Sequence, residues 1–296
     1  MNTQTPSHLS SLVQSIQAGT EEDVTRWLQE DSHLLTARAK TGNGWAAIHH
    51  AAAAGKLAVV QILLDAGFDP NLPSGEDDGE GTWVPGEKAI SIAVWKDHLR
   101  IVQHLLDHGA DPESADHFGH SSIHVAAMHN RVEHLNLLLH RGADPNAFSH
   151  RRHFDEVLDW HFLATPLHLA AMKNSTEAAR VLLAHGARRD ECWGDQRTPL
   201  FYAAATGSNG VAEVLLLAGA DPNQRERRKG YSTYLDHTPL HYAARNGHAP
   251  TVRLLLRHGA DPKLRETQRN LTALELARNE GHHEVVVLLE SLTCPP

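Results

Sequence analysis

A seven-residue motif repeats along the chain with almost the same residue types each time. Residues 165–171 (TPLHLAA) recur as residues 238–244 (TPLHYAA) and as residues 198–204 (TPLFYAA). Each copy is followed by an aliphatic run and then by Gly-Ala-Asp-Pro or a close variant. Weaker copies of the motif begin at residues 46, 88, 121 and 272. Such self-similarity predicts an array of similar units, each contacting its neighbours, in place of one large central core.

The residues of one unit predict two short helices and a turn. Thr165 can cap the first helix with its hydroxyl, and Pro166 at the first helical position sacrifices no hydrogen bond. The Ala pair keeps this helix thin, so a Leu-rich second helix can pack closely. Gly219 and Gly259 follow second helices, where a left-handed backbone favours glycine. The Asp-Pro that follows turns the chain outward into a hairpin-like loop.

These motifs stay in register over nearly the whole chain and resemble the ankyrin repeat. The resemblance implies an all-α solenoid of about seven to eight helix-turn-helix units. It also implies β-hairpin-like fingers on one edge and a concave recognition surface. We interpret residues 1–296 as a single ankyrin-repeat domain, whose first unit has a capping-box-like helix start at Thr20. Its parts are a degenerate N-terminal cap (8–35), central repeats (36–262), a C-terminal cap repeat (263–290) and a tail (291–296).

The spacing of the motifs alternates between two lengths. Copies begin at residues 46, 88, 121, 165, 198, 238 and 272, so the steps are 42, 33, 44, 33, 40 and 34 residues. The ankyrin period is about 33 residues, and every second step is longer by roughly seven to eleven. The extra residues follow the Asp-Pro turn and predict three elongated fingers, at residues 72–86, 147–163 and 224–236. Insertions on one edge of a solenoid often mark its binding face.

The three long fingers differ in chemistry but share a content of aromatic residues. They carry seven of the 16 aromatic residues of the chain, whereas the repeat core needs few. Aromatic and Arg side chains on loops commonly anchor a partner. The alternative is that these aromatics pack the fingers onto neighbouring helices. The finger residues that we expect to contact a partner are Trp83, Arg151, Arg152, Phe154, Trp160, Arg225, Arg227, Arg228, Tyr231 and Tyr234.

A second candidate surface follows the Ala pair of successive motifs. Trp95, Met128 and Met172 occupy equivalent positions there, in three consecutive units. In the family pattern these positions point away from the core, so the three side chains predict an apolar stripe on the concave face. Adaptable methionines on an exposed groove suit contact with a partner. The alternative is that they pack against the bases of the long fingers.

Charge and composition exclude several classes of protein. The net charge is −9, with −10 in residues 1–148 and +1 in residues 149–296. This balance argues against a general binder of nucleic acid, which stays a minor option for the basic third finger alone. The two distant cysteines make no disulfide framework, which favours a reducing compartment. We expect no secretory leader, because residues 1–20 lack a basic segment followed by an apolar stretch, and the sequence contains no apolar run of about 18 residues. We therefore expect a soluble, cytoplasmic protein that is monomeric by itself and does not enter a membrane.

Most of the 24 histidines have a structural assignment. The resemblance implies that the histidines of the motif itself bond to the backbone of a neighbouring loop (His49, His124, His168 and His241). Three others precede the glycine that ends a second helix, where a cation complements the helix C-terminus (His108, His185 and His258). A further three open a second helix (His98, His248 and His282). The surplus lies mainly between residues 117 and 161, where two or three histidines could meet and bind Zn²⁺.

No catalytic motif accompanies these histidines. The sequence contains neither a metal-ligand spacing such as His-Glu-x-x-His nor a Gly-x-Ser-x-Gly nucleophile turn. We expect no catalytic residue, no cofactor and no metal. The sequence predicts a non-enzymatic module that binds a protein partner through its concave face and long fingers, as an adaptor or an inhibitor of the immunity type. The alternative is an enzyme or a small-molecule or metal-binding protein that uses the groove and residues 117–161.

Overall fold

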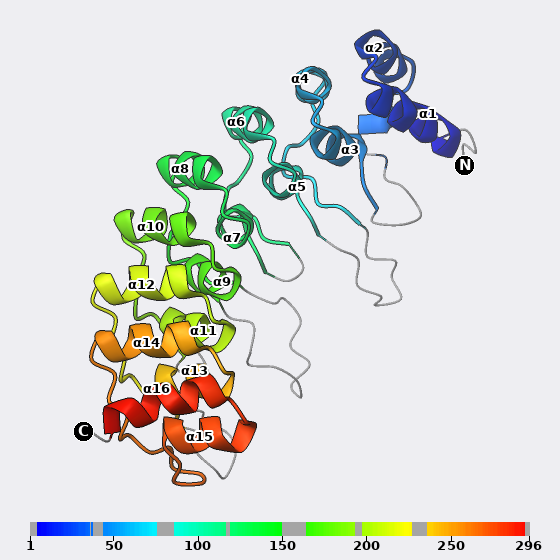
Figure 1. The fold of residues 1–296 in the computed structure, drawn as a ribbon. Helices are drawn as coiled ribbons and strands as arrows, with labels where there is room; N and C mark the ends of the chain where they lie inside the picture. Colours follow the sequence, from blue (N-terminus) through cyan, green and yellow to red (C-terminus); the bar gives the residue numbers. More distant parts are fainter. Residues whose placement is uncertain are drawn as a thin grey trace. The chain divides into compact units, whose positions relative to one another are not determined.

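The computed structural model consists of consecutive helix pairs (Figure 1). It describes residues 5–35, 37, 44–75, 86–116, 119–149, 164–192, 197–226 and 236–293. The first helices of the pairs are α1 (Thr5–Ala18), α3 (Ala47–Ala54), α5 (Ala89–Trp95), α7 (Ser122–Met128), α9 (Pro166–Lys173), α11 (Pro199–Thr206), α13 (Pro239–Arg245) and α15 (Ala273–Glu280). The second helices are α2 (Glu21–Glu30), α4 (Leu57–Asp65), α6 (Leu99–Asp107), α8 (Val132–His140), α10 (Thr176–Ala184), α12 (Asn209–Leu217), α14 (Ala249–Arg257) and α16 (His283–Thr293). A short 3-10 helix (Ser32–Leu35) follows α2.

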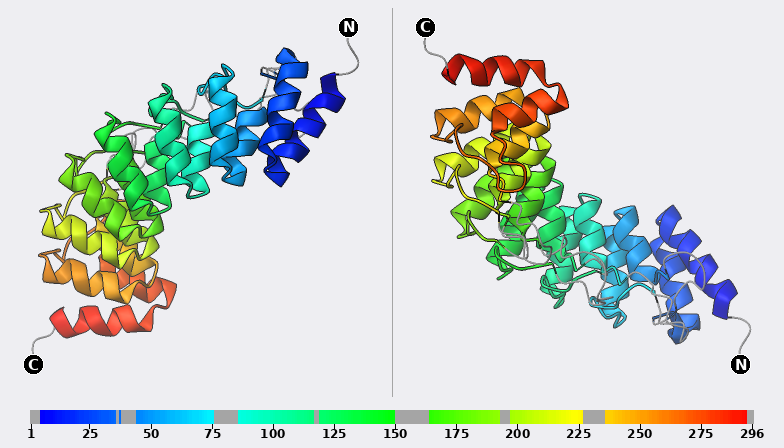
Figure 2. Two further views of the ribbon diagram at one scale, coloured as in Figure 1. Left: turned by 90° about the horizontal axis from the view of Figure 1, so that it is seen from above. Right: turned by 90° about the horizontal axis from the view of Figure 1, so that it is seen from below.

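The chain divides into two compact units, each of which is a two-layer stack (Figure 2). The first unit holds residues 1–126, 133–144 and 149–153, and the second unit holds the remainder. In the first unit α1, α3 and α5 pack in succession, and α2, α4 and α6 form the other layer. In the second unit α9, α11, α13 and α15 pack in succession beside α10, α12, α14 and α16. Both units have the repeated architecture that the motif predicts, and the assignment of a single domain stays a prediction.

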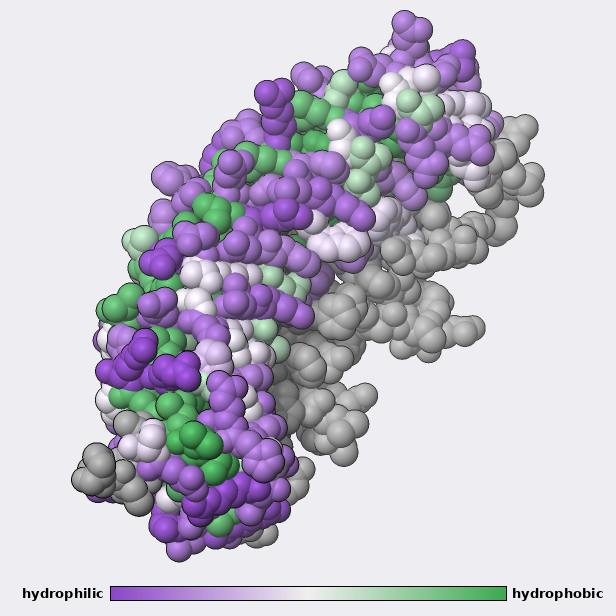
Figure 3. Space-filling model, viewed as in Figure 1, coloured by the Kyte–Doolittle hydropathy of each residue, from purple (hydrophilic) through white to green (hydrophobic). Residues whose placement is uncertain are grey.

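Small aliphatic side chains fill the space between the helices. The Ala pairs of the motif are fully buried, as at Ala203 and Ala204, and so are Leu182, Leu215 and Leu255 of the second helices. Each buried Leu contributes about 1.5–3 kcal/mol. Hydrophilic side chains cover most of the face seen in Figure 3, with apolar residues between them in separate patches. Among the described helices none is both long and apolar enough to cross a bilayer.

The first helices begin where the sequence predicts, and at α9 the His of the motif takes part in the helix cap. Thr165 precedes Pro166 at the start of α9. Its hydroxyl lies 2.8 Å from Nδ1 of His168, and its backbone N–H donates to the same nitrogen at 3.2 Å. Thr165 and His168 thus form a capping box at the start of α9, in keeping with the expected capping role of Thr165. Nδ1 of His168 accepts both hydrogen bonds because the His sits one turn into the helix.

The capping box predicted at Thr20, by contrast, does not form at the start of α2. Helix α2 begins at Glu21 as expected, but the Thr20 hydroxyl donates back to the carbonyl of Ser15 at 3.3 Å. A capping box does form at α15, where Thr272 Oγ1 accepts from the N–H of Glu275 at 3.3 Å. The N–H of Thr272 in turn donates to the Glu275 carboxylate at 2.7 Å.

Glycines end the second helices as predicted, with φ of +86° at Gly219 and +90° at Gly259. Several first helices also end at glycine, and the ring of a His from the next pair packs on it. A Cβ on Gly247 would lie 2.6 Å from the ring of His282. The same ring bonds through Nε2 to the carbonyl of Arg245 at 2.8 Å. We call this arrangement a Gly–His contact; the others join Gly55 to His98 and Gly207 to His248.

Two other first helices end at asparagine in the left-handed region. The φ values are 54° at Asn130 and 55° at Asn174. Asn130 Oδ1 accepts from the N–H of Ala178 at 2.9 Å, and Asn174 Oδ1 accepts from that of Val211 at 3.4 Å. Each asparagine thus satisfies an N–H at the start of a later second helix, where helices leave backbone donors unpaired. We call this arrangement an Asn cap.

The fingers are closed at their bases by backbone hydrogen bonds between their two arms. In the first long finger the N–H of Ser74 donates to Glu87 O at 2.8 Å, and in the third Glu226 donates to His237 O at 3.1 Å. The last, short finger has an isolated antiparallel bridge between Arg265 and Thr272. No regular β-strand occurs in the part of the chain that the structure describes. The central residues of the three long fingers lie outside that part.

Candidate interaction surfaces

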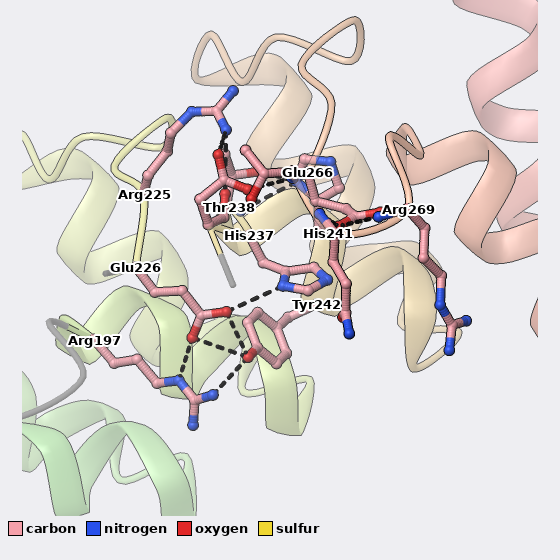
Figure 4. A network of polar contacts seen from close by, with 12 residues as sticks. Arg197, Arg225, Glu226, His237, Thr238, His241, Tyr242, Glu266 and Arg269 are labelled. Atoms are coloured by element: carbon pink, nitrogen blue, oxygen red, sulfur yellow. Dashed lines mark hydrogen bonds and ion pairs between the residues drawn. The ribbon is translucent and has the colours of Figure 1, made fainter. Parts of the chain in front are cut away.

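A buried carboxylate joins the two arms of the third long finger. Glu226 is fully buried, and Arg197 Nε donates to its Oε2 at 2.7 Å. The Tyr242 hydroxyl lies 2.9 and 3.0 Å from its two oxygens, and His237 Nδ1 lies 3.1 Å from Oε1 (Figure 4). Arg197 directly precedes the motif of α11, Tyr242 lies on α13, and His237 is on the opposite arm of the finger. One side chain therefore connects three parts of the second unit.

The surroundings of Glu226 keep it ionised. Burial raises the pKa of the Glu226 carboxyl, but hydrogen bonds from His237 and Tyr242 and the charge of Arg197 outweigh burial and hold the pKa below its usual value. Arg197 also donates to the Tyr242 hydroxyl at 2.6 Å and lies 5.2 Å from the centre of its ring. A buried ion whose partners are all in place is tolerated, whereas loss of one partner is costly.

The structure places Arg225 at the base of the same finger. Its guanidinium forms an ion pair with Asp236 on the other arm, and donates to Arg265 O at 3.1 Å. Asp236 also accepts from the N–H of Thr267 at 2.6 Å, so the pair ties the third long finger to the short finger that follows. Contact of Arg225 with a partner stays a prediction.

The short finger carries a glutamate at the equivalent position. Glu226 and Glu266 each lie five residues after the Asp of a Gly-Ala-Asp-Pro turn, which is Asp221 in one turn and Asp261 in the other. The Glu266 carboxylate accepts backbone N–H groups of its own loop, from Gln268 at 2.6 Å, Arg269 at 2.8 and 3.0 Å and Leu271 at 3.1 Å. Neither glutamate is among the residues expected from the sequence, although their identical offset from the turn is a usable signal.

A second surface lies at the ends of the first helices. Met172 is 40% exposed, and Lys173 beside it is exposed. The preceding pair lies against them, since the Ser175 hydroxyl donates to Met128 O at 3.1 Å. The pKa of His129 is lowered, first by partial burial of its ring and then by the positive charges of Arg131 and Lys173. We call the surface formed by Met128, His129, Arg131, Met172 and Lys173 the Met172 surface; all five residues belong to the second unit.

Trp95, the third member of the predicted apolar stripe, belongs to the first unit. It is 48% exposed, and Lys96 Nζ lies 3.9 Å from the centre of its ring. The continuous stripe of Trp95, Met128 and Met172 stays a prediction. The remaining predicted contact residues lie outside the described residues, and their contact with a partner also stays a prediction: Trp83, Arg151, Arg152, Phe154, Trp160, Arg227, Arg228, Tyr231 and Tyr234.

Three histidines of the motif, His49, His168 and His241, have the role that the resemblance implies. His168 Nε2 lies 3.1 Å from Arg197 O, His241 Nε2 3.1 Å from Leu264 O and His49 Nε2 3.0 Å from Leu72 O. A carbonyl can only accept, so Nε2 carries the proton and Nδ1 is free to accept at the helix start. Burial is the main cause that lowers the pKa of His168 and of His241 to about 4. Both rings are therefore neutral near pH 7.

The histidine surplus between residues 117 and 161 is only partly described. His120, His129 and His134 fall within the described residues, and His117, His150, His153 and His161 fall outside them. Within the described ranges no three His, Cys, Asp or Glu side chains are placed to share a metal ion. The metal-binding alternative for this region is left untested.

The chain matches a known protein family along most of its length. The family model described as "Ankyrin repeats (3 copies)" matches residues 1–116, 74–149, 153–226 and 228–294. The chain belongs to the ankyrin-repeat family. The crystal structure of the human ASB11 ankyrin repeat domain resembles it with a TM-score of 0.65 and 26% identity, over 84% of this chain and 98% of that one. Ankyrin repeats are generally protein–protein interaction modules without enzymatic activity.

Two curated relatives match shorter parts of the chain. The mitochondrial disaggregase of Bos taurus is 30% identical over 144 residues, which are 40% of this chain and 21% of that protein. Ankyrin repeat and SOCS box protein 3 of Homo sapiens is 31% identical over 131 residues, 36% of this chain and 25% of that protein. The matches thus span a quarter or less of the length of these relatives.

Proposed function

We propose that this chain is a non-enzymatic cytoplasmic module that grips a protein partner with its concave face and its three long fingers, as an adaptor or an inhibitor. The base of the third finger carries this proposal. Glu226 is buried and ionised there, bound by Arg197, His237 and Tyr242. A buried ion is a poor source of stability compared with apolar packing, so its use suggests that the position of the finger matters.

The fixed base of the third long finger favours contact between a protein partner and the residues that connect its two arms. Glu226 and Asp236 are both held in place, which sets where the segment 227–235 starts and stops. That segment contains two Arg, one Lys and two Tyr. Ordering a loop on a partner costs conformational entropy, and fixing its ends reduces this cost. Arg and Tyr are also among the residues that contribute most to protein interfaces.

Affinity capture from native lysate with mass spectrometry tests the proposal. We expect the wild-type chain to enrich a specific protein, and the triple variant Trp83→Ala, Trp160→Ala, Tyr234→Ala to lose most of it. The matched control is Arg180→Ala, Glu213→Ala, Arg253→Ala, three exposed residues on second helices, which should capture as the wild type does. Circular dichroism would verify that all variants are folded. Equal capture by both triple variants would remove the fingers from the proposal.

A further inference from the structure

The first helices of the second unit are free of carboxylates over a long stretch. Helices α9, α11 and α13 contain no Asp or Glu. The next first helix, α15, ends in Glu280, whose carboxylate lies 3.8 Å from Arg245 of α13 and is offset by it. At the other end of the row, partial burial and then the nearby charges of Arg131 and Lys173 lower the pKa of His129. This part of the unit therefore presents positive charge.

Apolar area and positive charge coincide on the Met172 surface. Met172 is exposed immediately before Lys173, and the Ser175 hydroxyl bonds to the carbonyl of Met128 from the preceding pair. Methionine is unbranched and polarisable, so it adapts to the shape of an apolar side chain placed on it. The cations beside it would attract carboxylates that flank such a side chain.

We propose that the Met172 surface binds an acidic segment of a protein partner, with an apolar side chain on Met128 and Met172 and carboxylates beside Arg131 and Lys173. This inference rests on the proposed function and names the chemistry of the partner. Nucleic acid is also anionic, but the Met172 surface holds no Trp, Tyr or Phe ring on which a base could stack. The net charge of −9 also opposes a long polyanion more than a short acidic segment.

The methionine content of the chain allows a direct measurement. The sequence contains only three methionines, Met1, Met128 and Met172. With ¹³C-methyl methionine the full chain therefore gives three methyl signals, which Met128→Leu and Met172→Leu would assign. The probe is a peptide of about twelve Asp and Glu residues with two central Leu, and its controls replace Leu by Ser, replace the acids by Lys, or use a thymidine dodecamer. We expect the acidic Leu peptide alone to shift the Met128 and Met172 signals.

A charge-reversal pair separates local contact from net charge. Lys173→Glu should weaken the acidic Leu peptide at least about tenfold, because attraction becomes repulsion. Arg180→Glu changes the net charge equally, but Arg180 is an exposed residue of the second helix α10. It should change the affinity less than about twofold. Raising the salt concentration should weaken binding to the wild type.

Four results would overturn the inference: unmoved Met128 and Met172 signals, equal effects of the two charge reversals, equal binding of the Lys peptide, or tighter binding of the thymidine dodecamer. These failures differ from failure of the proposed function. A chain that captures its protein partner through the fingers but ignores the acidic Leu peptide refutes only the present inference. A chain that captures no partner in any form refutes the proposed function.

Discussion

Glu226 and Glu266 occupy equivalent positions in adjacent repeats, but their buried carboxylates have different kinds of hydrogen-bond partner. Both carboxylates are buried at the base of a finger. In the short finger the N–H groups of Gln268, Arg269 and Leu271 surround the carboxylate. In the long finger the partners are side chains, and Arg197 and Tyr242 come from outside the finger.

The difference follows from the length of chain between the arms. Leu271, which pairs with the backbone of Glu266, is five residues away, whereas His237 pairs with Glu226 from eleven residues away. A tight loop folds its own N–H groups around a carboxylate, as Glu266 shows. The longer finger is instead tied to neighbouring repeats. A short finger is therefore a local structure, and the base of the long one depends on the stacking of the unit.

Acid should produce the largest effect, and it acts on both fingers. His168 bonds to the carbonyl of Arg197, beside the long finger, and His241 bonds to that of Leu264, in the short one. Both pKa values are lowered to about 4, so the unfolded chain binds more protons between pH 6.5 and 4. The contribution of the two neutral histidines to stability is thus fully present above pH 6.5. It is lost as the pH falls from 6.5 to 4, by up to about 3 kcal/mol for each histidine. Urea unfolding at several pH values would measure it.

The control for this prediction is the double variant His168→Gln, His241→Gln. Glutamine cannot titrate, so the loss of stability between pH 6.5 and 4 should shrink. An unchanged pH profile in that variant would assign the acid sensitivity to other groups.

Arg197→Ala should have the next largest effect, confined to the long finger. It leaves Glu226 buried without its cation, and breaking such a pair costs about 3–5 kcal/mol. The free energy of unfolding measures this cost, and Arg253→Ala on the exposed side of α14 serves as the control. The double variant Arg197→Ala, Glu226→Gln should recover part of the loss. Without that recovery the destabilisation would come from lost packing of the Arg197 side chain.

Glu266→Ala should cost less, about 1–3 kcal/mol, because it leaves only backbone donors of one loop unpaired. The effect of Glu266→Ala should also differ from that of Arg197→Ala in the part of the chain that it affects. Amide hydrogen exchange should accelerate at Gln268, Arg269 and Leu271 and stay unchanged at Glu226. Accelerated exchange at both finger bases would show that the short finger is not locally stabilised.

Arg225→Ala should have the smallest effect. The pair with Asp236 is partly exposed, with 34% and 17% of the two side chains accessible, so solvent screening limits it to about 0.5–1 kcal/mol. It also removes the link from the long finger to Arg265. A double-mutant cycle with Asp236→Ala measures the coupling. A coupling near zero would mean that the ion pair between Arg225 and Asp236 does not stabilise the base of the long finger.

The repeated motif, the helix pairs and the glycines that end helices could be predicted from the sequence, because their causes lie within one repeat or between a repeat and the next loop. Pro166, Gly219 and the motif histidine His168 act on residues a few positions away or on the next loop. The Glu226 network could not be predicted in the same way, because Arg197 and Tyr242 are 45 residues apart and meet only through the stacking register. The contact between the Thr165 hydroxyl and His168 Nδ1 could not be predicted either, because it depends on the neutral tautomer of the ring.

The two ways of ending a first helix have a consequence for how such chains can be recombined. A Gly–His contact needs a residue type on both sides of a boundary: Gly247 has room for the ring of His282 only because it lacks a Cβ. An Asn cap needs a residue type on one side only, since Asn130 bonds to a backbone N–H that any residue except proline supplies. Duplication or exchange of a repeat should therefore be tolerated at Asn boundaries, whereas at Gly–His boundaries both halves must be exchanged together.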